Sequence, residues 1–305
     1  MTGSSHEGAL DADSGVRRAQ VAHERTGVTT EAARHIMTTT RVVTVRDGRV
    51  RERTDQLAGE EPLEIRAAGP GQAPMRVAVT MRTPGHDFEL AAGFLITEGL
   101  VQPAAVETVA YCEDPDAQRY NVVTVRTRTH FDLGTAERNF FATSSCGICG
   151  KAALEAITVR CRSLGPGPAI SSDVLLTMPD VLREHQRVFD RTGGIHAAGL
   201  FDAGGGFLLV REDVGRHNAV DKVVGAMALG TASDGAVLLV SGRLSFEIVQ
   251  KAAVARIPII CAISAPSSLA VQAAEDLGLT AIGFLRPGGF NIYSHPERVR
   301  IRVAG

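Results

Sequence analysis

Residues 236–264 read AVLLVSGRLSFEIVQKAAVARIPIICAIS, and this stretch decides the fold class. Two apolar runs, at 236–241 and 257–264, flank a segment at 245–256 whose apolar residues recur at helical spacing. A strand, a helix and a strand in this order are typical of a parallel β-α-β unit. The stretch therefore predicts an α/β fold.

The same alternation continues on both sides of this unit. We expect strands at 207–210 and 279–285 and helices at 218–229 and 268–277. Open α/β sheets carry their functional loops at the carboxyl ends of strands. The expected loops hold small and basic residues, which are suited to an anionic ligand: Ser241-Gly242-Arg243, residues 264–268 and residues 285–289.

The first half of the chain has a different pattern. Short strands separated by Gly/Pro turns, with one helix at 87–98, predict a small α+β domain over 39–138. Residues 1–38, rich in small and charged residues, are expected to form a disordered leader. Residues 139–171 would connect the domains through a cysteine loop and a helix at 151–159. A second, α/β domain would then occupy 172–305.

Composition narrows the function classes. A formal net charge of −2 over 305 residues gives no overall basic field, so no nucleic-acid partner is expected. There is no apolar run of about 20 residues and no signal-peptide pattern, so we expect a cytoplasmic protein with no membrane partner. Five cysteines are few and odd in number, which favours reduced thiols over disulfides.

Residues 144–151 read SSCGICGK and contain the most reactive pattern in the chain. A glycine follows both Cys146 and Cys149, which leaves the two thiols accessible. Cys149 is expected at the start of the helix at 151–159, where the helix dipole and Lys151 would lower the thiol pKa. A thiolate of this kind can take up sulfur as a persulfide, and the second thiol can assist its transfer.

Three other interpretations of the cysteine pair were weighed. Half of a zinc site is one, but no second C-x-x-C completes four ligands, so no metal is expected. A thioredoxin-like redox pair is the second interpretation. Such a pair opens a helix early in a compact βαβ unit, whereas this one lies in the middle of the chain between two domains. A zinc deaminase would combine His196 with the cysteines, but Ala198 stands where H-x-E needs glutamate, which leaves only a hint about fold.

Polar residues concentrate in the second domain at 212–222, which reads EDVGRHNAVDK. Arg216, His217 and Asn218 would lie at a helix start, where side chains and free amides can bind phosphate or a purine edge. Helix capping is an equally good interpretation of Asn218 taken alone. Together with His196, Ser241 and Arg243, these residues indicate a large phosphorylated ligand.

Seven motifs, in order along most of the chain, resemble the formate dehydrogenase accessory sulfurtransferase family, FdhD. They are MRTPG at 81–85, GFLITEG at 93–99, SCGICG at 145–150, TGGIH at 192–196, EDVGRHNAVDK at 212–222, SGR at 241–243 and GFLR at 283–286.

The resemblance implies a function and a set of partners. A cysteine desulfurase would load sulfur onto Cys146, assisted by Cys149, for transfer to the molybdenum or tungsten of a bis(molybdopterin guanine dinucleotide) cofactor. Formate dehydrogenase would then receive that cofactor. The alternative to sulfur transfer is a different class of function, a chaperone that binds and delivers the cofactor and in which the cysteines are secondary. The site for the guanine dinucleotide would be lined by Phe284, Leu285, Arg286, Pro287, Gly288 and Gly289.

The resemblance also implies an architecture. The second domain would be similar to cytidine deaminases, with three α/β/α layers around a mixed sheet, and the protein would form homodimers. Two features depart from the family pattern: residues 1–38 lie outside it, and Pro287 stands where more polar residues are expected.

Overall fold

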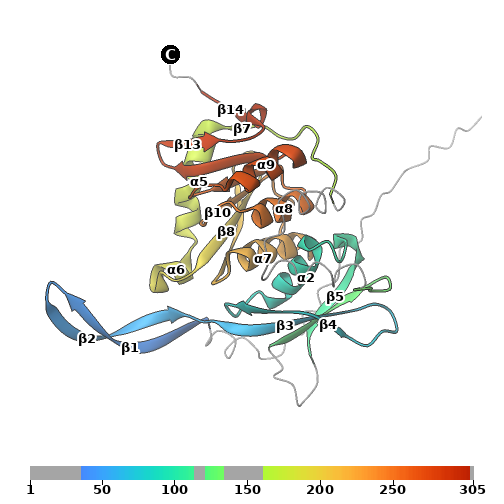
Figure 1. The fold of residues 1–305 in the computed structure, drawn as a ribbon, viewed down its shortest axis with the longest axis horizontal. Coiled ribbons are helices and arrows are strands. Elements are labelled where there is room, and N and C mark those ends of the chain that lie inside the picture. Colours follow the sequence, from blue (N-terminus) through green and yellow to red (C-terminus); the bar gives the residue numbers. More distant parts are fainter. Residues whose placement is uncertain (1–35, 113–120, 134–160, 303–305) are drawn as a thin grey trace, which may run out of the picture.

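The computed structural model describes residues 36–112, 121–133 and 161–302, which build two larger sheets with helices between them and two small sheets of two strands each (Figure 1). The smaller sheet has the strand order β4-β3-β6-β5. Its strands are β3 (Glu61–Ala68), β4 (Met75–Arg82), β5 (Val106–Tyr111) and β6 (Val122–Thr127). Helix α2 (Asp87–Thr97) packs against this sheet and buries Leu90, Leu95 and Ile96.

A β-hairpin extends away from the body of the protein (Figure 1). It consists of β1 (Met37–Arg46) and β2 (Arg49–Ala58), which pair in antiparallel register over their whole length. Asp47 and Gly48 form its two-residue turn with φ of 50° and 71°, the positive values that twisted hairpin turns require. Strand β1 thus begins at Met37, within the segment expected to be a leader.

The larger sheet has the order β13-β12-β11-β10-β8-β9 and is mixed. Strands β10, β11 and β12 run parallel, whereas β8, β9 and β13 join by antiparallel pairing. The α/β class and the mixed sheet are therefore confirmed. The strands are β8 (His196–Phe201), β9 (Phe207–Asp213), β10 (Val237–Val240), β11 (Ile259–Ala262), β12 (Thr280–Arg286) and β13 (Gly289–Ile292).

Helices cover both faces of this sheet. Alternate residues of β10 point to opposite faces, so Val237 and Leu239 pack with helix α5 (Ser172–Glu184), while Leu238 and Val240 pack with the helices of the other face. Those helices are α7 (Arg216–Ala228), α8 (Phe246–Val254) and α9 (Ser268–Leu277). The short elements are α6 (Arg187–Thr192), β7 (Ile170–Ser171), β14 (Val299–Arg300), η1 (Pro103–Ala105) and η2 (Pro296–Arg298).

One hydrophobic core joins the two halves of the chain. Helix α2 of the first half lies on α7 of the second (Figure 1), and Leu90 and Val220 belong to the same buried cluster. Two glycines let the helices approach closely. A methyl group on Gly93 would lie 1.8 Å from the Asp221 carbonyl oxygen, and one on Gly225 would lie 1.8 Å from that of Glu89.

The sequence patterns missed several elements, including β2, β5, β8, β13, α5 and α6. Strand β8 (His196–Phe201) is an almost fully buried central strand, so it lacks the alternation of a half-exposed strand. Strand β2 is mostly exposed and rich in charge, and α5 was not predicted at all. The domain limits at 138, 171 and 172 and the likeness to cytidine deaminases stay predictions. In the described ranges, every helix is too short or too polar to cross a lipid bilayer.

Candidate functional site

A cavity of about 700 Å³ lies at the carboxyl ends of the parallel strands. Its walls come from the residues after β10, β11 and β12 and from helix α5. Its volume is in the range of small-molecule sites. Of the residues predicted to bind a ligand, the cavity brings together His196, Ser241, Leu285, Arg286 and Pro287.

His196 begins strand β8 and lies beside the loop after β10. The Ser241 hydroxyl accepts a hydrogen bond of 2.9 Å from the Ala197 amide, which ties this loop to the strand. Partial burial, followed by the positive charge of Arg216, lowers the pKa of His196, while Asp213 opposes the shift. The imidazole is therefore neutral at pH 7, with one ring nitrogen able to accept and the other able to donate a hydrogen bond.

The loop after β10 passes close to the site residues at Gly242. A methyl group on it would lie 3.5 Å from His196 Nδ1 and 3.9 Å from Arg216 Cδ. The backbone of the loop thus lies close to both side chains. Arg243, the next residue, is exposed and is outside the cavity lining.

The end of β12 presents alternate side chains to different surroundings. Leu285 is buried and lines the cavity. Arg286 and Pro287 also line it, but they are exposed. Phe284 is 37% exposed with a φ of 55°, and the Arg286 guanidinium lies 5.7 Å from its ring centroid. Phe284, Gly288 and Gly289 do not line the cavity, and the two glycines belong to the turn into β13 and to the strand itself.

Arg216 and His217 open helix α7 but do not line the cavity. Burial, with the charges of Arg216 and Lys251, lowers the pKa of His217 to about 4, although Glu247 opposes the shift. Arg216 Nε and His217 Nε2 are buried and have no hydrogen-bond partner among the described residues. Such atoms are unusual in folded proteins and mark this helix start as a candidate ligand contact.

Asn218 is placed in the contact between the two halves of the chain. Its amide nitrogen donates to the Met81 carbonyl oxygen at 2.7 Å and to Asp213 Oδ1 at 3.0 Å. Its amide oxygen accepts a hydrogen bond from the Thr80 hydroxyl at 3.3 Å. The geometry therefore gives Asn218 a tethering role, and no atom of it lines the cavity.

The cysteine pattern cannot be placed in this site. Cys146, Cys149 and the helix expected at 151–159 lie outside the described residues. Among the described residues, Cys261 is fully buried in β11, as expected, and burial raises its thiol pKa. Those residues also contain no group of three or more His, Cys, Asp or Glu side chains that could hold a metal ion.

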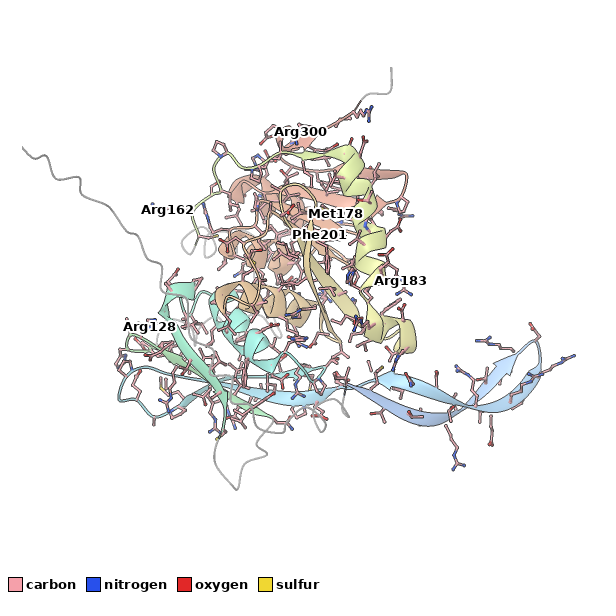
Figure 2. All side chains as sticks on the ribbon, turned by 180° about the vertical axis from the view of Figure 1, so that it is seen from behind. Arg128, Arg162, Met178, Arg183, Phe201 and Arg300 are labelled. Atoms are coloured by element: carbon pink, nitrogen blue, oxygen red, sulfur yellow. The ribbon has the colours of Figure 1, made fainter. Side chains whose placement is uncertain are left out.

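Sequence reasoning missed the outer wall of the cavity, which helices α5 and α6 supply. Asp180 and Arg183 come from α5, and Phe189 comes from α6. Figure 2 labels Arg183 on α5 and, deeper in the molecule, Met178 and Phe201 of the core beneath that helix. The signal was present, since the Ser171 side chain caps α5 and Leu175, Met178 and Leu182 recur at helical spacing.

Together, the mixed sheet and the cavity at its strand ends define an α/β protein with a candidate ligand site lined by a histidine, small loop residues and arginines. Comparison with known sequences identifies the family to which this α/β protein belongs. The chain belongs to the FdhD/NarQ family, whose model matches residues 58–300.

Relatives from distant organisms support the assignment. The chain is 49% identical to the sulfur carrier protein FdhD of Streptomyces coelicolor, over 87% of this chain and 96% of that protein. It is 43% identical to the sulfur carrier protein FdhD of Thermoplasma acidophilum, over 85% of this chain and 93% of that protein. A crystal structure from Desulfotalea psychrophila, described as that of a formate dehydrogenase accessory protein, matches with a TM-score of 0.67 and 25% identity, covering 87% of this chain and 100% of that one.

Proposed function

We propose that this protein is a sulfur carrier for the maturation of formate dehydrogenase. Cys146 accepts sulfur from a cysteine desulfurase and passes it to a bis(molybdopterin guanine dinucleotide) substrate containing molybdenum or tungsten. The observation that carries the proposal is the 49% identity to a sulfur carrier protein over 87% of the chain, a span that includes a ligand-sized cavity. The protein would act in the cytoplasm as a homodimer.

The first step moves one neutral sulfur atom between thiols. The Cys146 thiolate attacks the outer sulfur of the desulfurase persulfide, so a new S–S bond forms on Cys146 and the desulfurase leaves as its thiolate. This exchange requires no external oxidant or reductant.

The second step must deliver sulfide, which requires two electrons. The Cys149 thiolate can supply them by attacking the inner sulfur of the Cys146 persulfide. A Cys146–Cys149 disulfide then forms and hydrosulfide leaves toward the metal of the substrate. A cellular thiol reductant would return the disulfide to two thiols before the next cycle.

The cavity would bind a guanine dinucleotide arm of the substrate. Its volume of about 700 Å³ suits a nucleotide, and Arg286 offers a planar cation for phosphate. His196 and Ser241 add neutral hydrogen-bonding groups beside it. Arg216 Nε and His217 Nε2, which make no hydrogen bond among the described residues, would contact another part of the same substrate. Arg243, Phe284, Gly288 and Gly289 remain predicted contributors, whereas Asn218 would contribute by positioning, because its amide is engaged by Met81, Asp213 and Thr80.

The two cysteines can be tested separately. Cells that lack this protein would be complemented with wild type, Cys146→Ala or Cys149→Ala, and formate dehydrogenase activity would be measured. We expect no activity with Cys146→Ala, together with unchanged binding of GDP to the purified variant. Normal activity with Cys146→Ala would refute the sulfur relay and favour a cofactor-binding chaperone.

The Cys149→Ala variant tests the second step. It should still take up sulfur from the desulfurase and cysteine, because Cys146 is intact, but it should hold the persulfide instead of releasing sulfide. Rapid release of sulfide by this variant without added thiol would contradict the role of Cys149.

A further inference from the structure

We infer that Asp180 selects guanine over adenine in the cavity at the strand ends. The inference rests on the proposed function, because it concerns the nucleotide arm of the same substrate. It adds a residue that determines specificity and that belongs to none of the motifs in the sequence.

Asp180 is the sole acidic residue among the described residues that line the cavity. It lies on helix α5, whose inner face is held by the buried Leu175, Met178 and Leu182. The backbone that carries the carboxylate is therefore fixed against the sheet. An exposed carboxylate on a fixed helix can serve a ligand without disturbing the core.

No ion pair within the described ranges uses this carboxylate. The neighbouring Arg183 pairs with Asp190 of helix α6 instead, and its guanidinium lies 4.8 Å from the centroid of the Phe189 ring. Arg183 also lines the cavity, but its charge is engaged by Asp190. Asp180 thus remains available as a hydrogen-bond acceptor on the wall of the cavity.

The lining has two different chemical features. Asp180 contributes negative charge, whereas Arg286, the last residue of β12, contributes a positive charge, as does Arg183, which is paired with Asp190. Phe189 adds an aromatic ring, a surface on which a nucleobase can stack. A ligand that matches them has a flat ring with N–H donors at one end and an anionic group at the other, which describes a guanine nucleotide.

The carboxylate distinguishes the two purines through their donors. Guanine presents the N1–H and the exocyclic 2-amino group side by side, and a carboxylate accepts two parallel hydrogen bonds from such a pair. Adenine has an unprotonated N1 at the equivalent position, which would face the carboxylate with a second acceptor. Asparagine carries one donor and one acceptor, and that pattern matches adenine.

The experiment measures binding of GDP, IDP and ADP to the full-length protein by calorimetry. Wild type is compared with Asp180→Asn and with Glu184→Gln, a matched control on the exposed side of the same helix that does not line the cavity. Both substitutions keep the side-chain size and remove one negative charge. Equal melting temperatures would show that both variants fold.

We expect wild type to bind GDP at least about tenfold more tightly than ADP, with IDP between them because it lacks the 2-amino group. Asp180→Asn should lose at least about tenfold in GDP affinity and bind ADP more tightly than wild type does. Glu184→Gln should behave as wild type. Opposite changes for GDP and ADP are a result that a purely electrostatic role of Asp180 would not produce, because removing one negative charge would strengthen the binding of both anions.

Two results would overturn the inference, and they are distinguishable. If wild type binds GDP and Asp180→Asn binds it equally well, Asp180 does not read the base, while the proposed nucleotide site stands. If wild type binds no GDP at all, the nucleotide half of the proposed function fails, and the inference fails with it.

Discussion

The ammonium group of Lys222 lies 2.7 Å from Asp213 Oδ2, and both side chains are fully buried. Lys222 also donates to the Thr83 carbonyl oxygen at 2.9 Å, and the Thr83 amide donates to Asp213 at 3.1 Å. The polar run at 212–222 therefore holds the MRTPG segment at 81–85 of the first half of the chain. Part of that run stabilises the fold, and part of it faces the candidate site.

Replacing Lys222 with methionine should strongly destabilise the protein. The substitution keeps most of the side-chain volume but leaves the Asp213 carboxylate buried without its cation. We expect a loss of about 3–5 kcal/mol in the free energy of unfolding, measured by urea denaturation. Arg76→Met is the control, because Arg76 pairs with Glu64 at the surface and should cost less than about 1 kcal/mol. Equal losses for the two variants would contradict this account of the buried pair.

The close contact between α2 and α7 should make the protein sensitive to any side chain added at Gly93 or Gly225. Gly93→Ala and Gly225→Ala each place a methyl group against a backbone carbonyl oxygen, and backbone cannot rotate away. Each should lower stability by about 1–3 kcal/mol or more in thermal or urea unfolding. Gly165→Ala, where no atom lies within 4 Å of the added methyl group, should change stability by less than about 0.5 kcal/mol. Unchanged melting temperatures for the first two variants would show that the helices do not pack this closely.

Ionised Glu89 should stabilise the fold, and this stabilisation should be lost at acidic pH. Burial raises the pKa of Glu89, but hydrogen bonds and charge from Arg211, and to a lesser extent His86, outweigh burial and lower it from 4.5 to about 2. The contribution is complete above the unfolded pKa of 4.5 and is lost as pH falls toward 2. Integrated, it amounts to roughly 3 kcal/mol. Glu89→Gln should therefore be less stable at pH 7 and should lose less stability than wild type between pH 5 and 2. Parallel curves over that range would be inconsistent with an ionised Glu89 in the fold.

Arg286 should contribute directly to nucleotide affinity. Arg286→Ala removes a cation from the cavity, so GDP should bind about tenfold more weakly and raise the melting temperature less than in wild type. Arg300→Ala is the control, because Arg300 is an exposed residue of β14, labelled in Figure 2, that does not line the cavity. Identical GDP affinities for wild type and Arg286→Ala would exclude Arg286 from the site.

The sequence predicted the parallel unit around β10 and β11 well, because its two apolar runs and the amphipathic helix between them follow one another directly along the chain. It also singled out Ser241 and Arg286, because both follow from the rule that ligands bind at strand ends, and it singled out His196 from its polar surroundings at 192–196. Asp180 could not be found in this way. It comes from a helix that is distant in sequence and reaches the cavity only through tertiary packing.

The polar run at 212–222 shows a second limit. A ligand contact and a buried ion pair draw on the same residue types, so spacing alone could not separate Arg216 from Asn218. The structure separates them, because the Asn218 amide is fully engaged between the two halves of the chain while Arg216 Nε has no partner among the described residues. Sequence pattern identified the polar cluster, but only three-dimensional partners assign roles within it.

Mass spectrometry of the peptide that contains Cys146 tests the central claim most directly. The protein would be incubated with a cysteine desulfurase and cysteine without added reductant, then alkylated and digested. The sulfur-carrier account predicts one added sulfur atom on Cys146 in Cys149→Ala. In wild type it predicts either that added atom or the Cys146–Cys149 disulfide left by its release, and in Cys146→Ala it predicts no added sulfur. A Cys149→Ala peptide that gains no sulfur while the desulfurase itself carries persulfide would contradict the account.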